Sequence, residues 1–292
     1  MLQSIGKNQL KKFLRWAGTL IAVGAIIFVG SRLWEFGGKV DFERFESSDW
    51  LVIALSSVIY GAANLLLGYG WGCILLRFDK SVSFHWAQRV YGISQLAKYM
   101  PGNIFQFAGR QAMAMAGGVD GFLLAKSVGW ELSLLSLSGA LFGIVVVSIF
   151  FPAIPYWLLL FFLGLAILLV SIFLNHLFDR HISNAFRAYS AFLAVSGSLF
   201  VVVLELVSDG YPTQSEIPWI PVCGAYILAW LAGLVTPGSP AGLGVREVVL
   251  LYLVGGIVNE PALILAVLIG RMVTILGDIL YFLSSYFIGG KE

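Results

Sequence analysis

Hydrophobic residues in this chain fall into long runs separated by short polar segments. The longest runs come close to or exceed the ~20 residues that a helix needs to cross a bilayer, and they cover residues 16–34, 50–76, 122–150, 156–174, 189–207 and 262–288. The run at 122–150 is long enough to require a strong tilt or an extension beyond the hydrocarbon. The pattern predicts an all-α polytopic membrane protein with about six spanning helices.

Two further segments are each broken in the middle by a Pro-Gly pair. Residues 83–116 contain the sequence PGNIFQFAGR, which ends at Arg110, and residues 219–256 contain PGSPAGLGVR, which ends at Arg246. A Pro-Gly pair interrupts a helix and leaves backbone groups unpaired, which lipid tolerates only where protein or water satisfies them. We therefore predict two re-entrant helical hairpins.

The predicted hairpins are separated by an odd number of crossings, so they should enter the membrane from opposite faces and meet near its midplane. Each half of the chain then holds two helices, a hairpin and a third helix, which makes the halves an inverted repeat of the kind found in transporters. We expect these halves to be approximately residues 16–150 and 156–288, within a single transmembrane domain that covers residues 1–292.

Composition supports this class. The chain is 59% hydrophobic and only 12% charged, against ~25% charged in soluble domains. Most of the 18 Lys and Arg residues fall on one side of the predicted spans, the side that the positive-inside rule assigns to the cytoplasm. We predict a multi-pass protein of the cell (inner) membrane with its N-terminus and C-terminus in the cytoplasm.

Motifs for catalysis are missing from the sequence. Cys73 and Cys223 lie far apart without metal-ligand spacing, and no zinc-protease, serine-hydrolase or nucleotide-loop motif occurs. We therefore expect no catalytic residue, no metal, no cofactor and no nucleic-acid partner.

The predicted hairpin breaks are candidate anion sites, because the start of a helix presents free N–H groups and the positive end of a dipole. Asn103 and Ser239 are placed to cap the second half-helices. Arg110 and Arg246 lie about two turns further along, and arginine holds phosphate through paired hydrogen bonds. The predicted substrate-binding residues are Arg110, Arg246, Arg271, Asn103, Gln106, Ser239 and Glu247.

Glu131, Asp278 and Glu205 lie within predicted spans. A charge there costs about 2.5 to 3.5 kcal/mol on insertion scales. We predict that these acids balance the arginines or relay protons.

Structural explanations for the same residues stay open. Both hairpin arginines can snorkel to the interface as anchors, and the second can pair with the adjacent Glu247. Arg271 can pair with Glu131 instead of substrate. Lys98 is expected at the cytoplasmic surface, and Asn64 in a hydrogen bond between helices.

The second broken segment resembles part of the lysylphosphatidylglycerol synthase transmembrane-domain family. The resemblance rests on the TPG and GLGVRE sequences within residues 236–247 and covers roughly residues 50–287. The family usually reads Pro-Gly-Gly-Leu-Gly, whereas residues 239–241 intervene here.

The resemblance implies a lipid flippase or transporter that moves an anionic phospholipid or a polyprenyl-phosphate-linked lipid between leaflets. In bifunctional members a separate soluble domain transfers the amino acid, so we expect a stand-alone member without synthase activity. Two alternatives stay open: a membrane-embedded enzyme that modifies lipid headgroups, and a non-catalytic partner of a lipid or glycan enzyme. A homo-oligomer is also open.

Overall fold

The computed structural model describes residues 45–78, 82–100, 104–208, 218–236, 242 and 244–287. These residues form helices joined by turns, and no strand occurs among them. The prediction of an all-α protein is confirmed for this part of the chain.

Long apolar helices correspond to five of the six predicted spans. Five segments are long and apolar enough to cross a membrane, namely α2 (Ser47–Phe78), α5 (Gly121–Leu141) continuing into α6 (Gly143–Phe150), α7 (Tyr156–Leu177), α8 (Arg180–Ser208) and α11 (Glu260–Phe287). The remaining predicted span, at residues 16–34, lies outside the described residues. α8 begins well before the predicted start at residue 189, because the amphipathic stretch from Arg180 continues the same helix.

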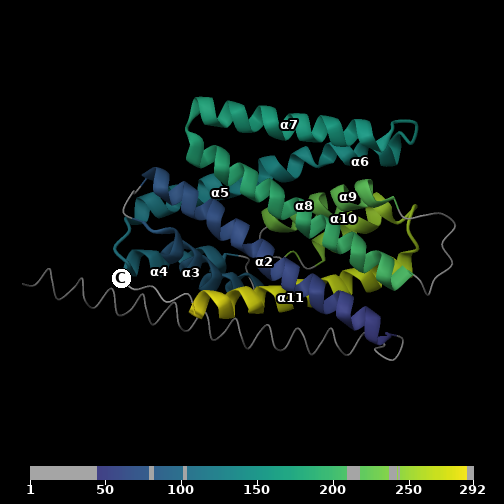
Figure 1. Cartoon of the computed structure of the whole chain (residues 1–292), viewed down its shortest axis with the longest axis horizontal. Helices are drawn as coiled ribbons and strands as arrows, with labels where there is room; N and C mark the ends of the chain where they lie inside the picture. Colours follow the sequence, from purple (N-terminus) through teal and green to yellow (C-terminus); the bar gives the residue numbers. More distant parts are fainter. Residues whose placement is uncertain are drawn as a thin grey trace, which may run out of the picture.

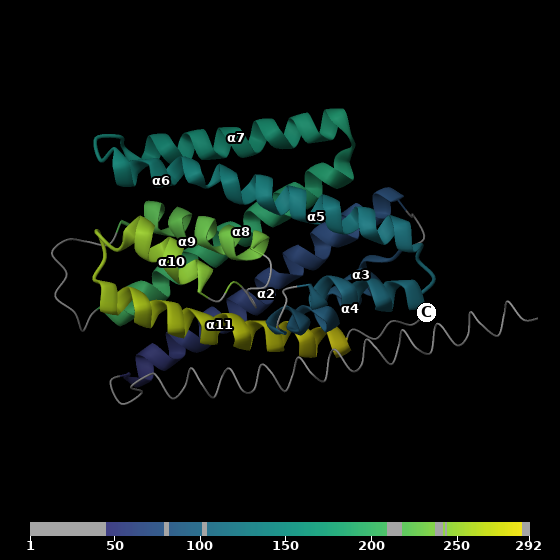
Figure 2. The same cartoon turned by 180° about the vertical axis from the view of Figure 1, so that it is seen from behind.

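Short helices occupy the two segments that the Pro-Gly pairs interrupt. The first segment contains α3 (Phe84–Gln95), the 3-10 turn η2 (Leu96–Tyr99) and α4 (Phe105–Ala116), and the second contains α9 (Trp219–Val235) and α10 (Val245–Val254). Figures 1 and 2 show α3 and α4 together toward one end of the molecule, and α9 and α10 together toward the other. The helical breaks therefore fall where the sequence predicts them.

The centre of the bundle is formed by α2, α8 and α11, which pack against one another. α2 and α8 cross the molecule in opposite directions (Figure 1). α3 packs on α2 and α11, while α9 packs on α6 and α8. α7 contacts α6 and α8 and leaves most of its surface open, so it forms the edge of the bundle.

Glycines allow α2 and α11 to cross at backbone contact. A Cβ atom added to Gly61 would lie 2.9 Å from the carbonyl oxygen of Gly277, and one added to Gly277 would lie 2.8 Å from the carbonyl oxygen of Ser57. In a lipid environment the hydrophobic effect does not drive helices together, and small residues such as glycine allow the backbones to pack closely instead. The crossing sets Asn64, one turn beyond Gly61, beside Asp278.

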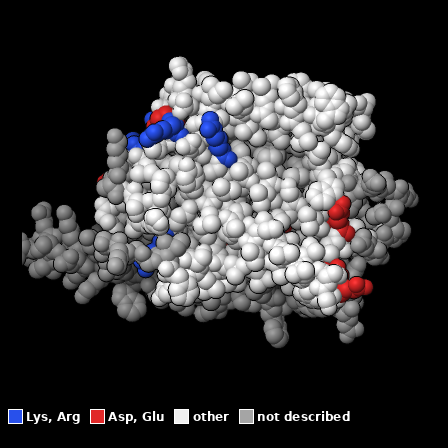
Figure 3. Space-filling view, viewed as in Figure 1, with Lys and Arg blue, Asp and Glu red and all other residues white. Residues whose placement is uncertain are grey.

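Charged residues near the two ends of the bundle differ in sign (Figure 3). One end carries a basic set made up of Arg77, Lys126, Arg180 and Arg187. The other carries an acidic set made up of Glu46, Asp49, Glu205 and Glu260. At the first end a salt bridge from Arg77 to Asp179 fastens α2 to the turn between α7 and α8.

The α2–α11 crossing generates a stability prediction. Gly277→Ala should lower the free energy of unfolding by about 1–3 kcal/mol, because the added methyl group meets backbone that cannot move aside. The measurement is thermal unfolding of the purified protein in detergent.

Gly129→Ala on α5 is the matched control, because a Cβ atom there meets nothing within 4 Å. Alanine in place of a helical glycine should stabilise this position by about 0.5–1 kcal/mol. Equal melting temperatures for the two variants would contradict the close crossing.

Candidate functional site

Ionisable side chains lie inside the bundle, away from its charged ends. Within the described residues Arg110, Arg271, Glu131 and Asp278 are buried, and the cations Lys98 and Arg246 and the carboxylate Glu247 lie half-buried beside them. Charges in an apolar interior are expensive unless they are paired and hydrogen-bonded. Their pairing therefore decides which of them are free for a ligand.

Glu131 on α5 is bound by two residues from the first short-helix pair. Arg110 on α4 forms a salt bridge through both carboxylate oxygens of Glu131, with 3.1 Å between Nη1 and Oε1, and the Tyr91 hydroxyl on α3 donates to Oε1 at 2.8 Å. The Arg110 guanidinium also lies over the rings of Tyr91 and Trp71, 4.4 and 4.9 Å from their centroids. Arg110 and Glu131 are 4% and 1% exposed. This group, the Glu131 cluster, joins α3, α4 and α5.

Asp278 on α11 is fully buried and collects donors from two other elements. Lys98 Nζ lies 2.7 Å from Oδ2, and the Tyr99 hydroxyl donates to the same oxygen. Asn64 Nδ2 donates to Oδ1 at 3.0 Å, and Gln95 Nε2 donates to the Asn64 side-chain oxygen at 3.5 Å. These residues form the Asp278 cluster. The expected hydrogen bond of Asn64 between helices is confirmed.

Lys98 does not lie at the surface, so that prediction is wrong. Its side chain is 16% exposed and reaches into the bundle to Asp278. The physical reason is the carboxylate, which has no exposure to water and needs a counter-charge in the interior.

Glu247 on α10 pairs with Arg271 on α11. Nε and Nη2 of Arg271 both donate to Oε1 of Glu247, at 2.9 and 2.6 Å. The pairs Arg271–Glu131 and Arg246–Glu247, which the sequence left open, therefore do not form. Successive residues on a helix do not share a face, so Glu247 meets α11 while Arg246 meets α9.

Arg246 is the cation left over. Each carboxylate of the set above has its own cation, and four cations less three carboxylates leaves one positive charge. Among the described residues the Arg246 guanidinium has no carboxylate partner: it lies 5.8 Å from the centroid of the Trp230 ring, and its buried Nε has no hydrogen-bond partner. The surplus charge is thus carried by Arg246, in the first turn of α10.

Glycines make room for the Arg246 side chain. A Cβ atom on Gly233 would lie 3.1 Å from Arg246 Cγ, and one on Gly242 would lie 2.8 Å from Nε. Gly242 also has a φ of 75°, in the region that favours glycine. The Arg246 side chain therefore lies directly against Gly242.

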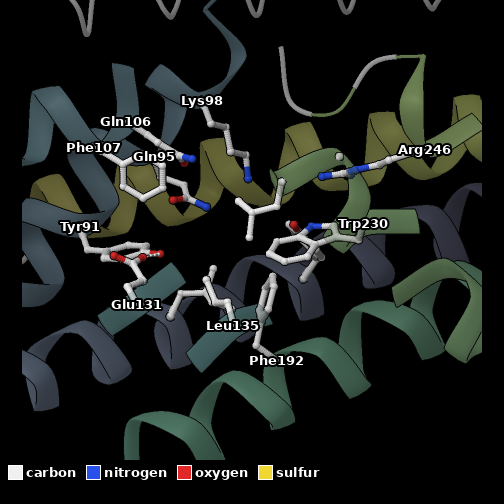
Figure 4. Close-up of a pocket in the computed structure, with 14 residues that line it drawn as sticks. Tyr91, Gln95, Lys98, Gln106, Phe107, Glu131, Leu135, Phe192, Trp230 and Arg246 are labelled. Carbon is white, nitrogen blue, oxygen red and sulfur yellow. Dashed lines mark hydrogen bonds between the residues drawn. The ribbon is translucent and has the colours of Figure 1, made fainter. Parts of the chain in front are cut away.

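Arg246 lines a cavity between the two short-helix pairs, which we call the central cavity. In Figure 4, Lys98 reaches into it from the top and Arg246 from the right. Its polar lining consists of Tyr60, Tyr91, Gln95, Lys98, Gln106, Glu131 and Arg246. The volume is about 50 Å³, room for a few water molecules, so a larger ligand requires the surrounding helices to separate.

The structure brings together most of the predicted site residues that it describes. Arg246 and Gln106 line the central cavity with Glu131, which holds Arg110, while the Arg271–Glu247 pair lies on the neighbouring α10 and α11. Glu205 is not part of this group: it is exposed near the acidic end and accepts a hydrogen bond from Trp219.

Asn103 and Ser239 lie outside the described residues. The N-cap positions of α4 and α10 are held by Ile104 and Gly244, and neither helix has a side-chain cap hydrogen bond. The capping roles of Asn103 and Ser239 therefore stay predictions. Glycine suits the N-cap position of α10 because the backbone there has a φ of 84°, a value that favours glycine.

Sequence reasoning missed Gln95, Lys98, Tyr99 and Trp230 as parts of this site. A signal existed for Lys98, because an aspartate inside a span requires a cation and Lys98 stands next to the first helical break. The aromatic partners carry no such signal in the sequence, since an aromatic residue in an apolar run is ordinary core.

Fold and site together describe an all-helical chain with candidate membrane-spanning helices and a charged, nearly closed interior. No family model matches the chain, and no curated protein matches it significantly. The resemblance to the lysylphosphatidylglycerol synthase transmembrane-domain family stays a prediction.

The Glu131 cluster generates a coupling prediction. Arg110→Gln should lower the free energy of unfolding by about 3–5 kcal/mol, because it leaves Glu131 charged and uncompensated in the interior. Arg110→Gln combined with Glu131→Gln should recover most of that loss. A double-mutant cycle from thermal or chemical unfolding in detergent measures the coupling, and additive effects of the two changes would contradict a buried pair.

Proposed function

We propose that this protein is a multi-pass membrane transporter that moves an anionic lipid, a phospholipid or a polyprenyl-phosphate-linked lipid, between leaflets. The observation that carries the proposal is Arg246, a half-buried cation that has no carboxylate partner in the described part of the chain and faces a polar cavity. An anionic headgroup would supply the missing charge, and a guanidinium binds phosphate through paired hydrogen bonds.

An inverted repeat, a construction that many transporters use for alternating exposure of such a site, is part of the proposal. The order of elements supports it: α2, the α3–α4 pair and α5 are followed by α8, the α9–α10 pair and α11. The equivalent helices α2 and α8 pack together in opposite directions, and the short pairs lie toward opposite ends (Figure 2).

Side-chain contacts support the same repeat. Arg110–Glu131 joins the second short helix of one pair to the long helix that follows it, and Glu247–Arg271 does the same in the other half with the charges exchanged. The second short helix of each half also carries an arginine that lies over an aromatic ring of the first short helix. Arg110 on α4 lies over Tyr91 on α3, and Arg246 on α10 lies over Trp230 on α9. We propose that both pairs are re-entrant hairpins.

Lys98 would link headgroup binding to movement of the helices. It holds Asp278 while lining the central cavity together with Arg246. A phosphate between the two cations would compete with Asp278 for Lys98 and loosen η2 from α11. The lipid tails would stay in the bilayer while the halves rock about the cavity. Uphill movement would need an ion gradient, with Glu131 and Asp278 as the carboxylates that protons would reach.

A transport assay tests the role of Arg246. In proteoliposomes containing a fluorescent phosphatidylglycerol, Arg246→Gln should reduce the transfer rate by roughly tenfold or more, as expected for the loss of one charged hydrogen-bonding partner worth about 1.5–3 kcal/mol. The control is Lys126→Gln, which removes an exposed cation over Phe122 at the basic end and should leave the rate unchanged.

Two outcomes would contradict the transporter. Equal rates for wild type, Arg246→Gln and protein-free vesicles would show that the protein does not move this lipid. Conversion of the lipid to a new species, detected by mass spectrometry, would favour the headgroup-modifying enzyme instead.

Sidedness follows from the charge difference between the two ends. We propose that the basic end faces the cytoplasm in the inner membrane, since positive residues accumulate on that side, and that both chain termini lie there. With Cys73 and Cys223 replaced, a cysteine at His176 should react with an impermeant thiol reagent only after cells are opened. A cysteine at Ala153 should react in intact spheroplasts, and the reverse pattern would invert the proposed topology.

A further inference from the structure

An apolar groove, separate from the central cavity, opens between α7 and α8. Its volume is about 500 Å³, and residues of α6 and α9 form its base. α7 contributes one helical face with Leu160, Gly164 and Ile167, and α8 contributes a face of small residues that includes Ala191 and Ala194. The groove therefore arises where small side chains leave two helices apart.

The two helices diverge along the groove. α7 and α8 are held together near the turn that joins them, where Ser171 and Ser183 are hydrogen-bonded at 2.8 Å, and they separate toward the other end (Figure 1). The α8 positions that line the groove run from Arg187 to Ser198, about 16 Å of helix. That length is close to half of a ~30 Å hydrocarbon core, or one leaflet.

Arg187 stands at the end of the groove near the basic end of the molecule. Its Nε donates to Ser171 Oγ on α7, which fixes the guanidinium across the two helices. Within the described residues Arg187 has no carboxylate partner, and its side chain is exposed. A cation held at the mouth of an apolar slot complements a lipid, which carries phosphate at one end and hydrocarbon at the other.

We infer that this groove binds one anionic phospholipid, with an acyl chain in the slot and its phosphate on Arg187. The inference rests on the location of the protein in a membrane but not on transport through the central cavity. Leu160, Phe161 and Leu168 around the groove are 46%, 60% and 52% exposed, so this surface would face lipid. An empty apolar slot would forfeit dispersion contacts that a hydrocarbon chain supplies.

Native mass spectrometry of the purified protein with added phosphatidylglycerol tests the site. Gly164→Trp fills the slot from α7 without a clash, because a Cβ atom there meets nothing within 4 Å, and it should remove one retained lipid. Ala191→Phe fills the slot from α8 and should remove the same lipid. Gly129→Trp is the matched control, since it adds the same side chain at another open, exposed glycine, and should leave the lipid count unchanged.

Arg187→Gln tests the headgroup contact. Wild type should prefer phosphatidylglycerol over phosphatidylcholine at this site by roughly fivefold, the effect of one basic residue at a lipid surface, and the variant should lose that preference. Arg246→Gln should keep the lipid, so a failure of the transport proposal would not remove this site.

The inference would be overturned if Gly164→Trp, Ala191→Phe and Gly129→Trp all retain the same number of lipids as wild type. It would also be overturned if Gly164→Trp converts a dimer to monomers without changing the lipids per chain, because a second copy would then fill the groove.

Discussion

Buried carboxylates hold this helix bundle together, because each one must be surrounded by donors and those donors come from different helices. Asp278 on α11 binds α2 through Asn64 and η2 through Lys98. Glu131 on α5 binds α4 through Arg110 and α3 through Tyr91. In an apolar interior, loss of one partner leaves an uncompensated charge, so these contacts fix the short helices to the long ones. The described short helices are therefore tied to the long helices by ion pairs as well as by packing.

The cost of an unpaired charge also applies to Arg246, which has no carboxylate partner among the described residues. An interior cation costs about 2.5 to 3.5 kcal/mol on insertion scales, and Arg246 meets an aromatic ring and a polar cavity instead of a carboxylate. Gly233 and Gly242 leave space for its side chain, so the backbone is shaped around it. The site thus has an unbalanced positive charge and a volume of only about 50 Å³.

Much of the fold could be predicted from the sequence, because apolar length and Pro-Gly breaks have direct physical consequences for helices. The five candidate spans among the described residues and the two interrupted segments follow from those patterns alone. The partners of the charges could not be predicted. Which carboxylate meets Arg271 depends on how α10 lies on α11, a tertiary contact with no local signal, and the inward turn of Lys98 depends on Asp278 far along the chain. The cap at Gly244 was missed because a positive φ belongs to the folded loop.

The most direct test of this account is the structure of the protein determined in a lipid bilayer that contains phosphatidylglycerol. The account predicts a phosphate group within hydrogen-bond distance of the Arg246 guanidinium, in a central cavity that has widened relative to its present volume of about 50 Å³. A cavity that stays closed around water, with Arg246 bonded only to groups of the protein itself, would contradict it.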